Sequence, residues 1–529
     1  MQITGHDMMV VPENSYLLDQ KYHSEELVER ISKSFSVEEE GRFEVTEIFY
    51  DTFDWKLYRK KNLLSVFRGR LILRHFDGTV LGSLACSGNR NFFWWDLKDS
   101  GLKEILAALV GIRALSPTLN LRRSSRTFRI VNTDVKTVVR FSVELCCCLE
   151  REGVKTLPEW LHVTGIRGYD KNYRRLVNTL PAEYLRPLSS PVELIEAAYA
   201  VSERQPLDYG GKFDVKLEQN IGVEDALARI SLNLVASMEI NRPGIIADID
   251  TEFLHDFRIA VRRTRSLLSL LRKALPAARI EPYEHEFIWL GNISGPVRDI
   301  DVYLLKKETY RSLVPPSLVD GLDLFFDDLA DRRKKELKRL RQYLRSERYR
   351  DLTGSWREYL ADPQSQLFIG ARNQSCKKLV DSIIKKRFRT FIEKGDLIDD
   401  DSPDEALHRF RIKGKKIRYL LELFKSFYPP SDIGLFLKQM KRLQDNLGDF
   451  NDLSVQIEML ESRLKGLHGE NKETIRLAAA LGSLISALQK KHRRTREKFN
   501  KTYREFRTDE NRRLITRMTT GTWAGKGKS

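Results

Sequence analysis

LHDFRIAVRRTRSLLSLL at residues 254–271 returns as LHRFRIKGKKIRYLLELF at residues 407–424, 153 positions further along the chain. The same offset, without a gap, places LGNISGPVRDIDV at residues 290–302 on LQDNLGDFNDLSV at residues 443–455. Self-similarity at a fixed spacing is typical of a duplicated structural unit. Apolar residues recur every three or four positions in both copies, which predicts amphipathic helices. The C-terminal part of the chain therefore contains two copies of one helical unit.

Each repeated helix separates a basic face from an apolar one. In the first copy, one His and three Arg fall within an arc of roughly 80° when successive residues are about 100° apart. Apolar side chains such as Phe257 and Leu268 occupy the opposite side, and the second copy follows the same arithmetic. We call these two basic faces the stripes. They are formed by His255, Arg258, Arg262 and Arg265 in the first copy and by His408, Arg411, Lys415 and Arg418 in the second.

The stripes have a structural and a functional interpretation. A charged stripe is often only the solvated face of a helix, but such faces normally mix signs to form i,i+4 pairs, and neither stripe contains an acid. Like charges four residues apart destabilise a helix unless an anion neutralises them. Each stripe extends over roughly 15 Å at about 1.5 Å per residue, which fits a row of phosphates better than one small anion. A metal site at the two histidines is disfavoured because the neighbouring arginines would repel a cation.

The charge distribution supports a polyanionic partner for the same part of the chain. Lys and Arg number 91 against 74 Asp and Glu, a net charge of +17. Residues 1–210 carry 29 basic and 28 acidic side chains, whereas residues 211–529 carry 62 and 46. Further basic runs lie at residues 331–350, 377–389 and 490–513. Each run alone fits a solvated helix, but with the stripes they would surround an anion from several directions.

The sequence predicts an α+β chain of two domains. Residues 1–190 contain short β-branched and aromatic runs with a hairpin signal at Asp77–Gly78, which predicts antiparallel strands. Residues 191–211 are rich in Pro and Gly and are predicted to be a linker. Residues 212–513 are predicted to be all-α, with repeats at about 220–365 and 370–513, followed by a basic tail at residues 514–529.

Cysteine usage and hydropathy bear on the compartment. Five cysteines, of which Cys146, Cys147 and Cys148 are consecutive, make no disulfide scaffold and fit a reducing, cytoplasmic compartment. The three also lack the Cys-x-x-Cys spacing of a zinc site. We identify no secretory signal and no apolar run long enough to span a bilayer, so no membrane partner is expected. No cofactor or metal is predicted either, and the sequence does not indicate an oligomeric state.

The repeated helices and the stretches that follow them resemble the two halves of a CHAD domain, the conserved histidine α-helical domain, over about residues 212–513. The resemblance implies two antiparallel helical bundles related by a pseudo-two-fold axis, with the stripes facing each other across a groove that binds inorganic polyphosphate. Asp299 and Asp452, at matching positions, are expected to orient basic side chains or cap helices. The implied polyphosphate contacts are the two stripes with Arg263 and Lys416 beside them, that is His255, Arg258, Arg262, Arg263, Arg265, His408, Arg411, Lys415, Lys416 and Arg418.

The N-terminal half is similar to a CYTH domain, the antiparallel β-tunnel, or barrel, of triphosphate-handling enzymes, which often precedes CHAD in bacterial proteins. TEIFYDTFDWKLYRKKNLLSV at residues 46–66 and GIRGYDKNYRRLVNTL at residues 165–180 carry the similarity. The family's opening Glu-x-Glu-x-Lys strand falls on residues 17–21, where Leu17 and Asp19 replace the two acids. Late in the tunnel, Cys146 follows Glu144 where paired acids are expected. Mg²⁺ requires several hard oxygen ligands, so we expect a degenerate tunnel without hydrolytic activity.

The sequence thus predicts a protein that is not an enzyme, binds inorganic polyphosphate in a basic groove between two helical repeats, and is recruited to polyphosphate granules. One alternative is a metal-dependent triphosphatase or polyphosphatase whose helical domain supplies the substrate. The other is a nucleic-acid-binding protein, which the aromatic residues disfavour. Single-strand binders interleave basic residues with aromatic side chains that stack on bases. Phe257 and Phe410 instead lie on the packing side, and Tyr419 alone lies beside a stripe.

Overall fold

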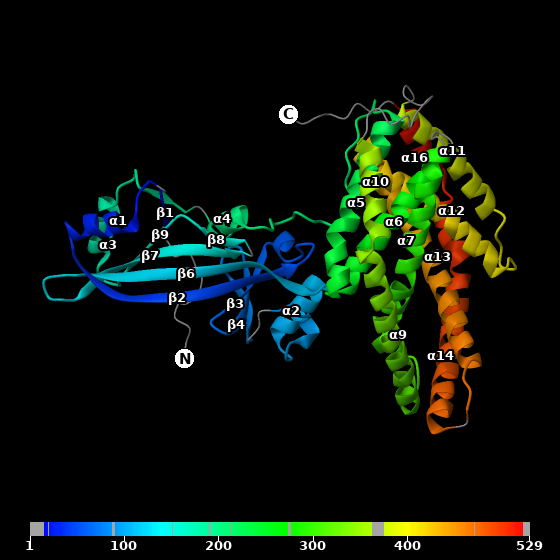
Figure 1. Cartoon of the computed structure of the whole chain (residues 1–529), viewed down its shortest axis with the longest axis horizontal. Coiled ribbons are helices and arrows are strands. Elements are labelled where there is room, and N and C mark those ends of the chain that lie inside the picture. The colour runs from blue at the N-terminus through cyan, green and yellow to red at the C-terminus, as the bar shows by residue number, and fades with distance from the viewer. Residues whose placement is uncertain are drawn as a thin grey trace. The chain divides into compact units, whose positions relative to one another are not determined.

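The chain folds into two compact units, Met1–Gly211 and Lys212–Ser529 (Figure 1). The structure is a computed structural model. It describes residues 15–19, 21–86, 90–150, 152–188, 190, 192–211, 213–272, 277–361, 375–469 and 471–521.

The N-terminal unit is built on an antiparallel sheet. Among the described residues, ten strands pair in the order β10-β1-β9-β7-β6-β2-β3-β4-β5, with β8 added beside β7. The long strands β2, β6 and β7 form its centre (Figure 1). The strands are β1 (Ser15–Leu18), β2 (Ser36–Thr52), β3 (Asn62–Phe67), β4 (Arg70–His75), β5 (Val80–Ala85), β6 (Leu115–Val131), β7 (Thr137–Glu150), β8 (Gly153–Thr156), β9 (Trp160–Gly165) and β10 (Leu185–Pro187).

The antiparallel prediction is confirmed, but the closed tunnel or barrel is not observed. The end strands β10 and β5 do not pair with each other in the described part of the chain, so the sheet is open. The predicted hairpin joins β4 to β5, and Gly78 at its turn has a φ of 90°, a backbone conformation that glycine adopts without strain.

Helices cover the sheet and bury its apolar side chains. Helices α1 (Ser24–Ser32) and α3 (Asp170–Thr179) pack on β6, β7 and β9, and α2 (Gly101–Val110) packs on β3 and β4. Helix α4 (Glu193–Val201) lies within the predicted linker, yet it buries Leu194, Ile195, Ala198 and Tyr199 against β6 and β7. Residues 193–201 of the predicted linker therefore form a helix whose apolar face belongs to the core of this unit.

The consecutive cysteines alternate across β7, as a strand requires. Cys146 and Cys148 are fully buried and Cys147 is only partly covered, and all three thiols are free. Burial raises the pKa of the Cys148 thiol to about 11. These side chains therefore serve as packing residues.

The second unit is helical, and its helices repeat at the offset that the sequence shows. Adding 153 to the residue numbers of α5 gives the position of α11. The same offset relates α6 to α12 and α9 to α14. The helices are α5 (Val223–Ala247), α6 (Thr251–Leu271), α7 (Ala277–Leu304), α8 (Lys307–Arg311), α9 (Val319–Arg345), α10 (Glu347–Ala361), α11 (Cys376–Gly395), α12 (Asp404–Leu423), α13 (Pro430–Lys465), α14 (Lys472–Glu497), α15 (Phe499–Phe506) and α16 (Asp509–Thr520).

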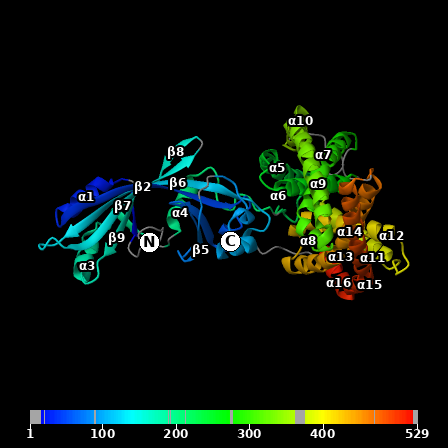
Figure 2. The same cartoon turned by 90° about the horizontal axis from the view of Figure 1, so that it is seen from below.

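The two repeats pack against each other (Figure 2). Gly222 and Ser375, which are equivalent residues, pair in an antiparallel bridge. A pairing of two equivalent positions is what a local two-fold relation between the repeats requires. Farther along, the ends of α7 and α13 share a hydrophobic core with α9 and α14, in which Phe325, Leu460 and Leu484 are almost fully buried.

The helical unit continues past residue 513, which is the predicted end of the all-α domain. Helix α16 runs to Thr520 and buries Leu514, Ile515 and Met518. The predicted basic tail therefore begins later than expected, and residues 522–529 of that tail lie outside the described residues. Among the residues that the structure describes, no helix combines the length and the hydropathy of a membrane-spanning segment.

Candidate anion-binding site

Helices α6 and α12 present the two stripes. Helix α6 begins after Asp250, whose carboxylate accepts two backbone hydrogen bonds at the helix start. The apolar side of each helix is buried as predicted, with Phe257 and Leu268 in α6 and Phe410 and Leu421 in α12. The stripe residues are half-buried or exposed. The basic side chains therefore lie on the side of each helix that keeps contact with solvent.

Arg262 brings the first stripe to the second. Its guanidinium carbon lies 5.2 Å from the ring centroid of Tyr419 on α12, and the guanidinium carbon of Arg418 lies 5.4 Å from the same ring. Arg262 is also among the cations that lower the pKa values of Arg411 and Lys415. The structure thus places side chains from both stripes close enough to repel one another.

Lys415 experiences this repulsion most strongly. Its ammonium group loses hydration on burial, and Arg411, Arg262 and Arg418 lie nearby, so that the pKa falls from 10.5 to about 8. Asp452 opposes the shift without cancelling it. Within the described ranges, Lys415 makes no hydrogen bond and no ion pair. A half-buried cation of this kind is stabilised by an anion that approaches it.

Arg258, on the first stripe, is partly committed to the protein. Its Nη1 donates hydrogen bonds to the carbonyl of Gly291 at 2.9 Å and to Oγ of Ser294 at 3.0 Å, both on α7. Burial lowers its pKa, nearby Arg residues add to this, and Asp299 opposes it. His255, one turn earlier on α6, is half-buried. Arg258 therefore anchors the stripe to α7.

The acids that follow each repeated helix orient basic side chains, as expected. Asp452 on α13 lies 3.5 Å from Nη2 of Arg411, and Asn451 beside it shares a hydrogen bond with Nδ1 of His408. Asp299, the equivalent acid in the first repeat, interacts with Arg258. The Nε of Arg411 is still buried without a hydrogen-bond partner among the described residues. Arg411 thus retains a donor for a ligand.

Glu422 neutralises two of the predicted ligand contacts. Its carboxylate lies 3.2 Å from Nη2 of Arg263 on α6 and 3.3 Å from Nε of Arg418 on α12. The guanidinium of Arg263 also lies over the ring of Phe213. The Arg263–Glu422 ion pair therefore links the two repeats, whereas the Arg418–Glu422 pair lies within α12. The stripe residues alone do not predict this arrangement, because Glu422 lies one turn beyond Arg418 and only tertiary packing brings Arg263 to it.

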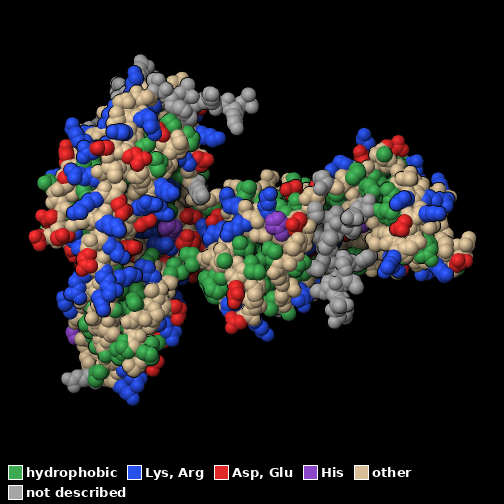
Figure 3. Space-filling view, turned by 180° about the vertical axis from the view of Figure 1, so that it is seen from behind, with side chains coloured by type: hydrophobic (Ala, Val, Ile, Leu, Met, Phe, Trp, Pro, Cys, Tyr) green, Lys and Arg blue, Asp and Glu red, His purple; other side chains and the backbone are tan. Residues whose placement is uncertain are grey.

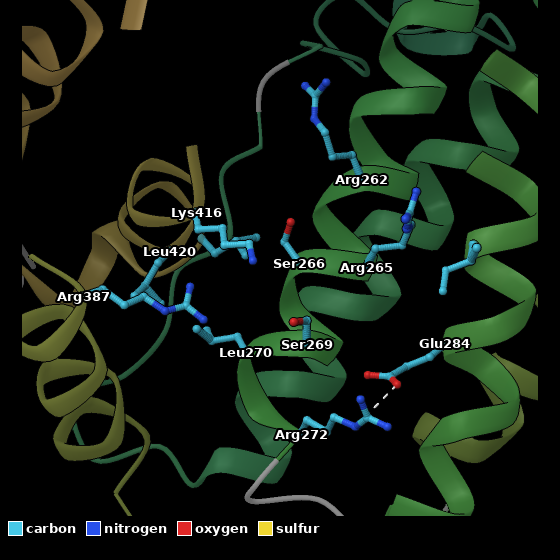
Figure 4. A pocket seen from close by; sticks show the side chains of 12 residues that line it. Arg262, Arg265, Ser266, Ser269, Leu270, Arg272, Glu284, Arg387, Lys416 and Leu420 are labelled. Carbon is cyan, nitrogen blue, oxygen red and sulfur yellow. Dashed lines mark ion pairs between the residues drawn. The ribbon is translucent and has the colours of Figure 1, made fainter. Parts of the chain in front are cut away.

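A cavity of about 450 Å³ opens between the repeats. It contains three of the predicted residues, Arg262, Arg265 and Lys416, and one acid, Glu284, which lies 3.8 Å from Arg272. Figure 4 shows Lys416 and Arg387 reaching toward α6 from the other repeat. The cavity is lined by Arg262, Arg265, Ser266, Ser269, Leu270, Arg272, Glu284, Ile288, Arg387, Lys416, Leu420 and Leu423.

Arg272 and Arg387 were not predicted as site residues. Arg272 follows α6 immediately, outside the repeated stripe, and Arg387 lies in the basic run at residues 377–389. Arg387 makes no ion pair or hydrogen bond within the described ranges, and burial lowers its pKa. The basic run was the available signal for Arg387, but only the packing of α11 beside α12 shows which of its members faces the cavity.

In the N-terminal unit, the two acids that remain at the positions of the family's metal site, Asp19 and Glu144, lie in different environments. Asp19 is exposed after β1 and accepts a hydrogen bond from the backbone N–H of Lys21. Glu144 is buried and forms a bidentate ion pair with Arg123 on β6. Burial raises the pKa of Glu144, but Arg123 outweighs that effect, and the pKa lies below its usual value. These residues do not fit a shared Mg²⁺ ion.

Other buried charges on the same sheet are also paired with one another. Arg123 reaches Glu47 on β2 at 3.5 Å, and Glu47 pairs with Arg74 on β4. His162 on β9 lies 3.8 Å from Glu144, and burial lowers its pKa. Across the described residues, no group of three or more His, Cys, Asp or Glu side chains is arranged to hold a metal ion.

The whole helical unit is rich in basic side chains. On the face shown in Figure 3, Lys and Arg form a dense group on the lower half of this unit. Many of the cations elsewhere are paired with acids, such as Arg333 with Asp248 and Asp301. In the α6–α12 region, Lys415 and Lys416 have no such partner among the described residues.

Comparisons with known proteins found one curated relative and solved structures that are similar to part of this chain. An uncharacterized protein of Mycobacterium tuberculosis is 26% identical over 212 residues, which are 39% of this chain and 39% of that protein. The chain thus spans about two fifths of that relative. The crystal structure of the CHAD domain from the plant Ricinus communis is 22% identical with a TM-score of 0.44, covering 54% of this chain and 96% of that one. PptA from Streptomyces chartreusis is 15% identical with a TM-score of 0.42, covering 54% and 100%.

The family match identifies the repeated helices. The model of the CHAD domain matches residues 230–461, a range that runs from within α5 to within α13 and includes both stripes. It lies wholly within the helical unit and does not reach the N-terminal sheet, for which the CYTH resemblance stays a prediction. Residues 230–461 of this chain therefore form a CHAD domain.

Proposed function

We propose that the helical unit binds inorganic polyphosphate where α6 meets α12. The observation that carries this proposal is the group formed by Arg262, Arg411 and Lys415, in which cations from both repeats are held together and partly buried. The nearest acid, Asp452, pairs with Arg411 and leaves Lys415 without a partner in the described structure. An anion would relieve the repulsion and replace the lost hydration.

The spread of the cations favours a chain of phosphates over a single anion. Arg262 belongs both to this group and to the cavity, where Arg265, Arg387 and Lys416 add further positive charge. Arg supplies paired N–H donors that match phosphate oxygens, and Lys supplies a compact charge. Sites of this kind arranged in a row would each engage a different phosphate of one chain.

The same geometry disfavours nucleic acid. Proteins that bind single strands offer aromatic faces on which bases stack. Tyr419, the aromatic residue beside the stripes, is buried, and the guanidinium groups of Arg262 and Arg418 lie near its ring. A nucleic-acid base therefore finds no free aromatic face at Tyr419. The phosphate backbone of a nucleic acid would be bound only as any other polyanion is.

A competition experiment tests the proposal. Long-chain polyphosphate is titrated against the full chain at two salt concentrations, and then against single-stranded RNA at equal phosphate concentration. We expect polyphosphate to win, and its affinity to fall steeply with salt because each neutralised phosphate releases counterions. An affinity independent of salt, or preferential binding of RNA, would contradict the proposal.

We further propose that the N-terminal unit has no hydrolytic activity. Asp19 is exposed and Glu144 is already engaged by Arg123, so these two acids are not arranged to share a divalent cation. Incubation of the full chain with tripolyphosphate and Mg²⁺ or Mn²⁺ should release no phosphate. Metal-dependent release that disappears in an Asp19→Ala, Glu144→Gln variant would establish the alternative, a triphosphatase fed by the helical unit.

Binding to polyphosphate would also determine where the protein resides. We propose a cytoplasmic protein that polyphosphate recruits to granules. A fluorescent fusion should then coincide with granules in cells that contain them and spread through the cytoplasm in cells that cannot make polyphosphate. A distribution unaffected by the loss of polyphosphate would contradict this part of the proposal.

A further inference from the structure

The two ends of the space between α6 and α12 are equivalent by the repeat but differ in chemistry. At one end, Arg263 and Glu422 form an ion pair at 3.2 Å that links the repeats. The residues 153 positions away from them are Lys416 and Ser269. Both line the open cavity, and the short neutral side chain of Ser269 leaves Lys416 without an acidic partner in the described structure. One end is bridged, and the other is open.

Helix α11 differs from its counterpart α5 at the open end. On α5, Ala226, Ile230 and Leu234 are almost fully buried. The equivalent residues of α11 are Leu379, Ile383 and Arg387, and these line a second cavity of about 450 Å³. The face that is covered in the first repeat is thus accessible in the second. An apolar floor suits long basic side chains, whose alkyl stems pack on it while their charged ends stay in solvent.

The second cavity continues the first and leads to a third. It shares Ser269, Leu270, Arg387 and Lys416 with the first cavity. It shares Ser382 and Lys386 with a third cavity of about 670 Å³, which reaches α16 at Thr519. The second cavity is lined by Ser269, Leu270, Leu379, Ser382, Ile383, Lys386, Arg387, Thr390, Lys413 and Lys416, and the third by Lys378, Asp381, Ser382, Lys385, Lys386, Arg389 and Thr519.

The charge of this path is almost entirely positive. The second cavity contains four cations and no acid. The one acid of the third cavity, Asp381, is already engaged by Lys377 at 2.6 Å and by the hydroxyl of Tyr428 at 2.8 Å. Neither Lys386 nor Lys413 has an ion pair or hydrogen bond among the described side chains. These lysines are free to meet an anion.

The first repeat lacks the basic residues that line this path. Five basic residues of α11 line the second and third cavities: Lys378, Lys385, Lys386, Arg387 and Arg389. Their equivalents on α5 are Asp225, Leu232, Asn233, Leu234 and Ala236. The position equivalent to Lys413 is Ala260. The extension is therefore a property of the second repeat alone and does not follow from the duplication.

We infer that a polyphosphate chain held between α6 and α12 continues out of that space at one end only, across α11, where Lys386 and Arg387 of α11 and Lys413 of α12 bind its further phosphates. The inference rests on the proposed function and adds a direction to it. The Arg263–Glu422 ion pair closes the opposite end. Chains long enough to reach α11 should then bind more tightly than short ones, because each further contact forms at high effective concentration.

The first test removes the extension without altering the α6–α12 site. Binding of long-chain polyphosphate and of tripolyphosphate is measured for the unmodified full chain and for a Lys386→Ala, Lys413→Ala variant. The control variant, Lys335→Ala, Lys338→Ala, removes two exposed lysines of α9 that line none of the three cavities.

We expect the α11–α12 variant to lose about tenfold in affinity for the long chain and to show a salt slope lower by about one per lysine. Its affinity for tripolyphosphate, and both affinities of the control, should change less than about twofold. Equal losses for long and short chains, or equal losses in the two variants, would overturn the inference. Absence of polyphosphate binding by the unmodified chain would instead refute the proposed function itself.

A second variant is designed to bridge the open end with an ion pair, as Arg263 and Glu422 bridge the other end. The substitution Ser269→Glu introduces at this exposed position the same acid that the equivalent position 422 carries. The new carboxylate would lie beside Lys416. We expect the long chain to lose its advantage over tripolyphosphate, while circular dichroism and thermal unfolding stay unchanged. A full long-chain advantage in this variant would show that the chain does not leave by this end.

Discussion

Lys415→Met should stabilise the fold while weakening the binding of polyphosphate. The substitution removes the charge of a half-buried lysine and keeps a flexible side chain of similar length. The pKa of Lys415 is about 8 in the folded protein against an ordinary value of 10.5. At about 1.36 kcal/mol per pKa unit, this difference corresponds to about 3.4 kcal/mol. Because Lys415 keeps contact with solvent, screening reduces the effect, and we expect a gain of about 1–2 kcal/mol at pH 7.

The sign of the pH dependence follows from the direction of the shift. Between about pH 8 and pH 10.5 the unfolded chain holds a proton on Lys415 that the folded protein has released. The free energy of unfolding therefore rises with pH across this window because of Lys415. Polyphosphate keeps the ammonium group charged, so binding takes up a proton above about pH 8, and the affinity should fall as the pH rises further.

Two assays on the same samples check these expectations. Denaturant unfolding at pH 7 and pH 9.5 measures stability, and titration with long-chain polyphosphate at the same two pH values measures affinity. We expect Lys415→Met to bind about tenfold more weakly at pH 7, which corresponds to about 1.4 kcal/mol, and to show a smaller loss of affinity between the two pH values. Lys335→Met on α9 serves as the control and should change neither quantity.

One outcome would refute the reasoning. If Lys415→Met were less stable than the unmodified chain and bound polyphosphate equally well, Lys415 would be a packing residue whose charge is satisfied within the fold. The stripe of the second repeat would then be solvated surface, and the group formed with Arg262 and Arg411 would lose its functional meaning.

Three further predictions concern the same unit. Arg262→Glu and Arg411→Glu should each weaken long-chain binding by similar factors of about 10 to 100 while leaving the far-ultraviolet circular dichroism unchanged; if either change were harmless, the site would not be shared by both repeats. Glu422→Gln should raise polyphosphate affinity several-fold in the same titration, because two arginines lose their acidic partner; an unchanged affinity would leave those arginines a purely structural role. Gly321→Ala should destabilise the unit by about 1–3 kcal/mol in denaturant unfolding, because the added Cβ would stand 2.3 Å from the carbonyl oxygen of Arg476; equal stability would show that α9 and α14 readjust freely.

The sequence was most informative where one pattern recurs. The 153-residue offset predicts that α6 and α12 are copies of one helix, and the helical period predicts which side of each is buried, as Phe257 and Phe410 confirm. The buried side can be predicted because it depends on the local spacing of apolar residues. The sheet of the first unit was predicted for the same reason, since hairpins and β-runs are local, whereas its closure depends on whether distant strands such as β10 and β5 meet.

The parts that the sequence could not predict depend on tertiary contacts. Glu422 lies on the same face of α12 as the second stripe, one turn beyond Arg418, but only the approach of α6 brings Arg263 to it. Arg387 lies within a run of basic residues whose members are alike in sequence and differ only in what they face. The flanking Pro and Gly residues predict a linker over residues 191–211, but the apolar face of α4 within it packs on the sheet.

The duplication explains both why a site arises between the repeats and why it became one-ended. Equivalent positions lie across from each other near the local two-fold relation, as the Gly222–Ser375 bridge shows. A basic residue retained at one position is thereby placed near its own equivalent, which doubles the positive charge without any further change. After duplication the two copies are free to differ, and a single acid at position 422 opposite a serine at position 269 is enough to bridge one end and leave the other open. A symmetric ancestor would hold a phosphate chain in either direction, whereas this chain places the further cations Lys386, Arg387 and Lys413 on α11 and α12 of the second repeat. One repeat expressed without the other should therefore lack both the paired stripes and the path that leads away from them.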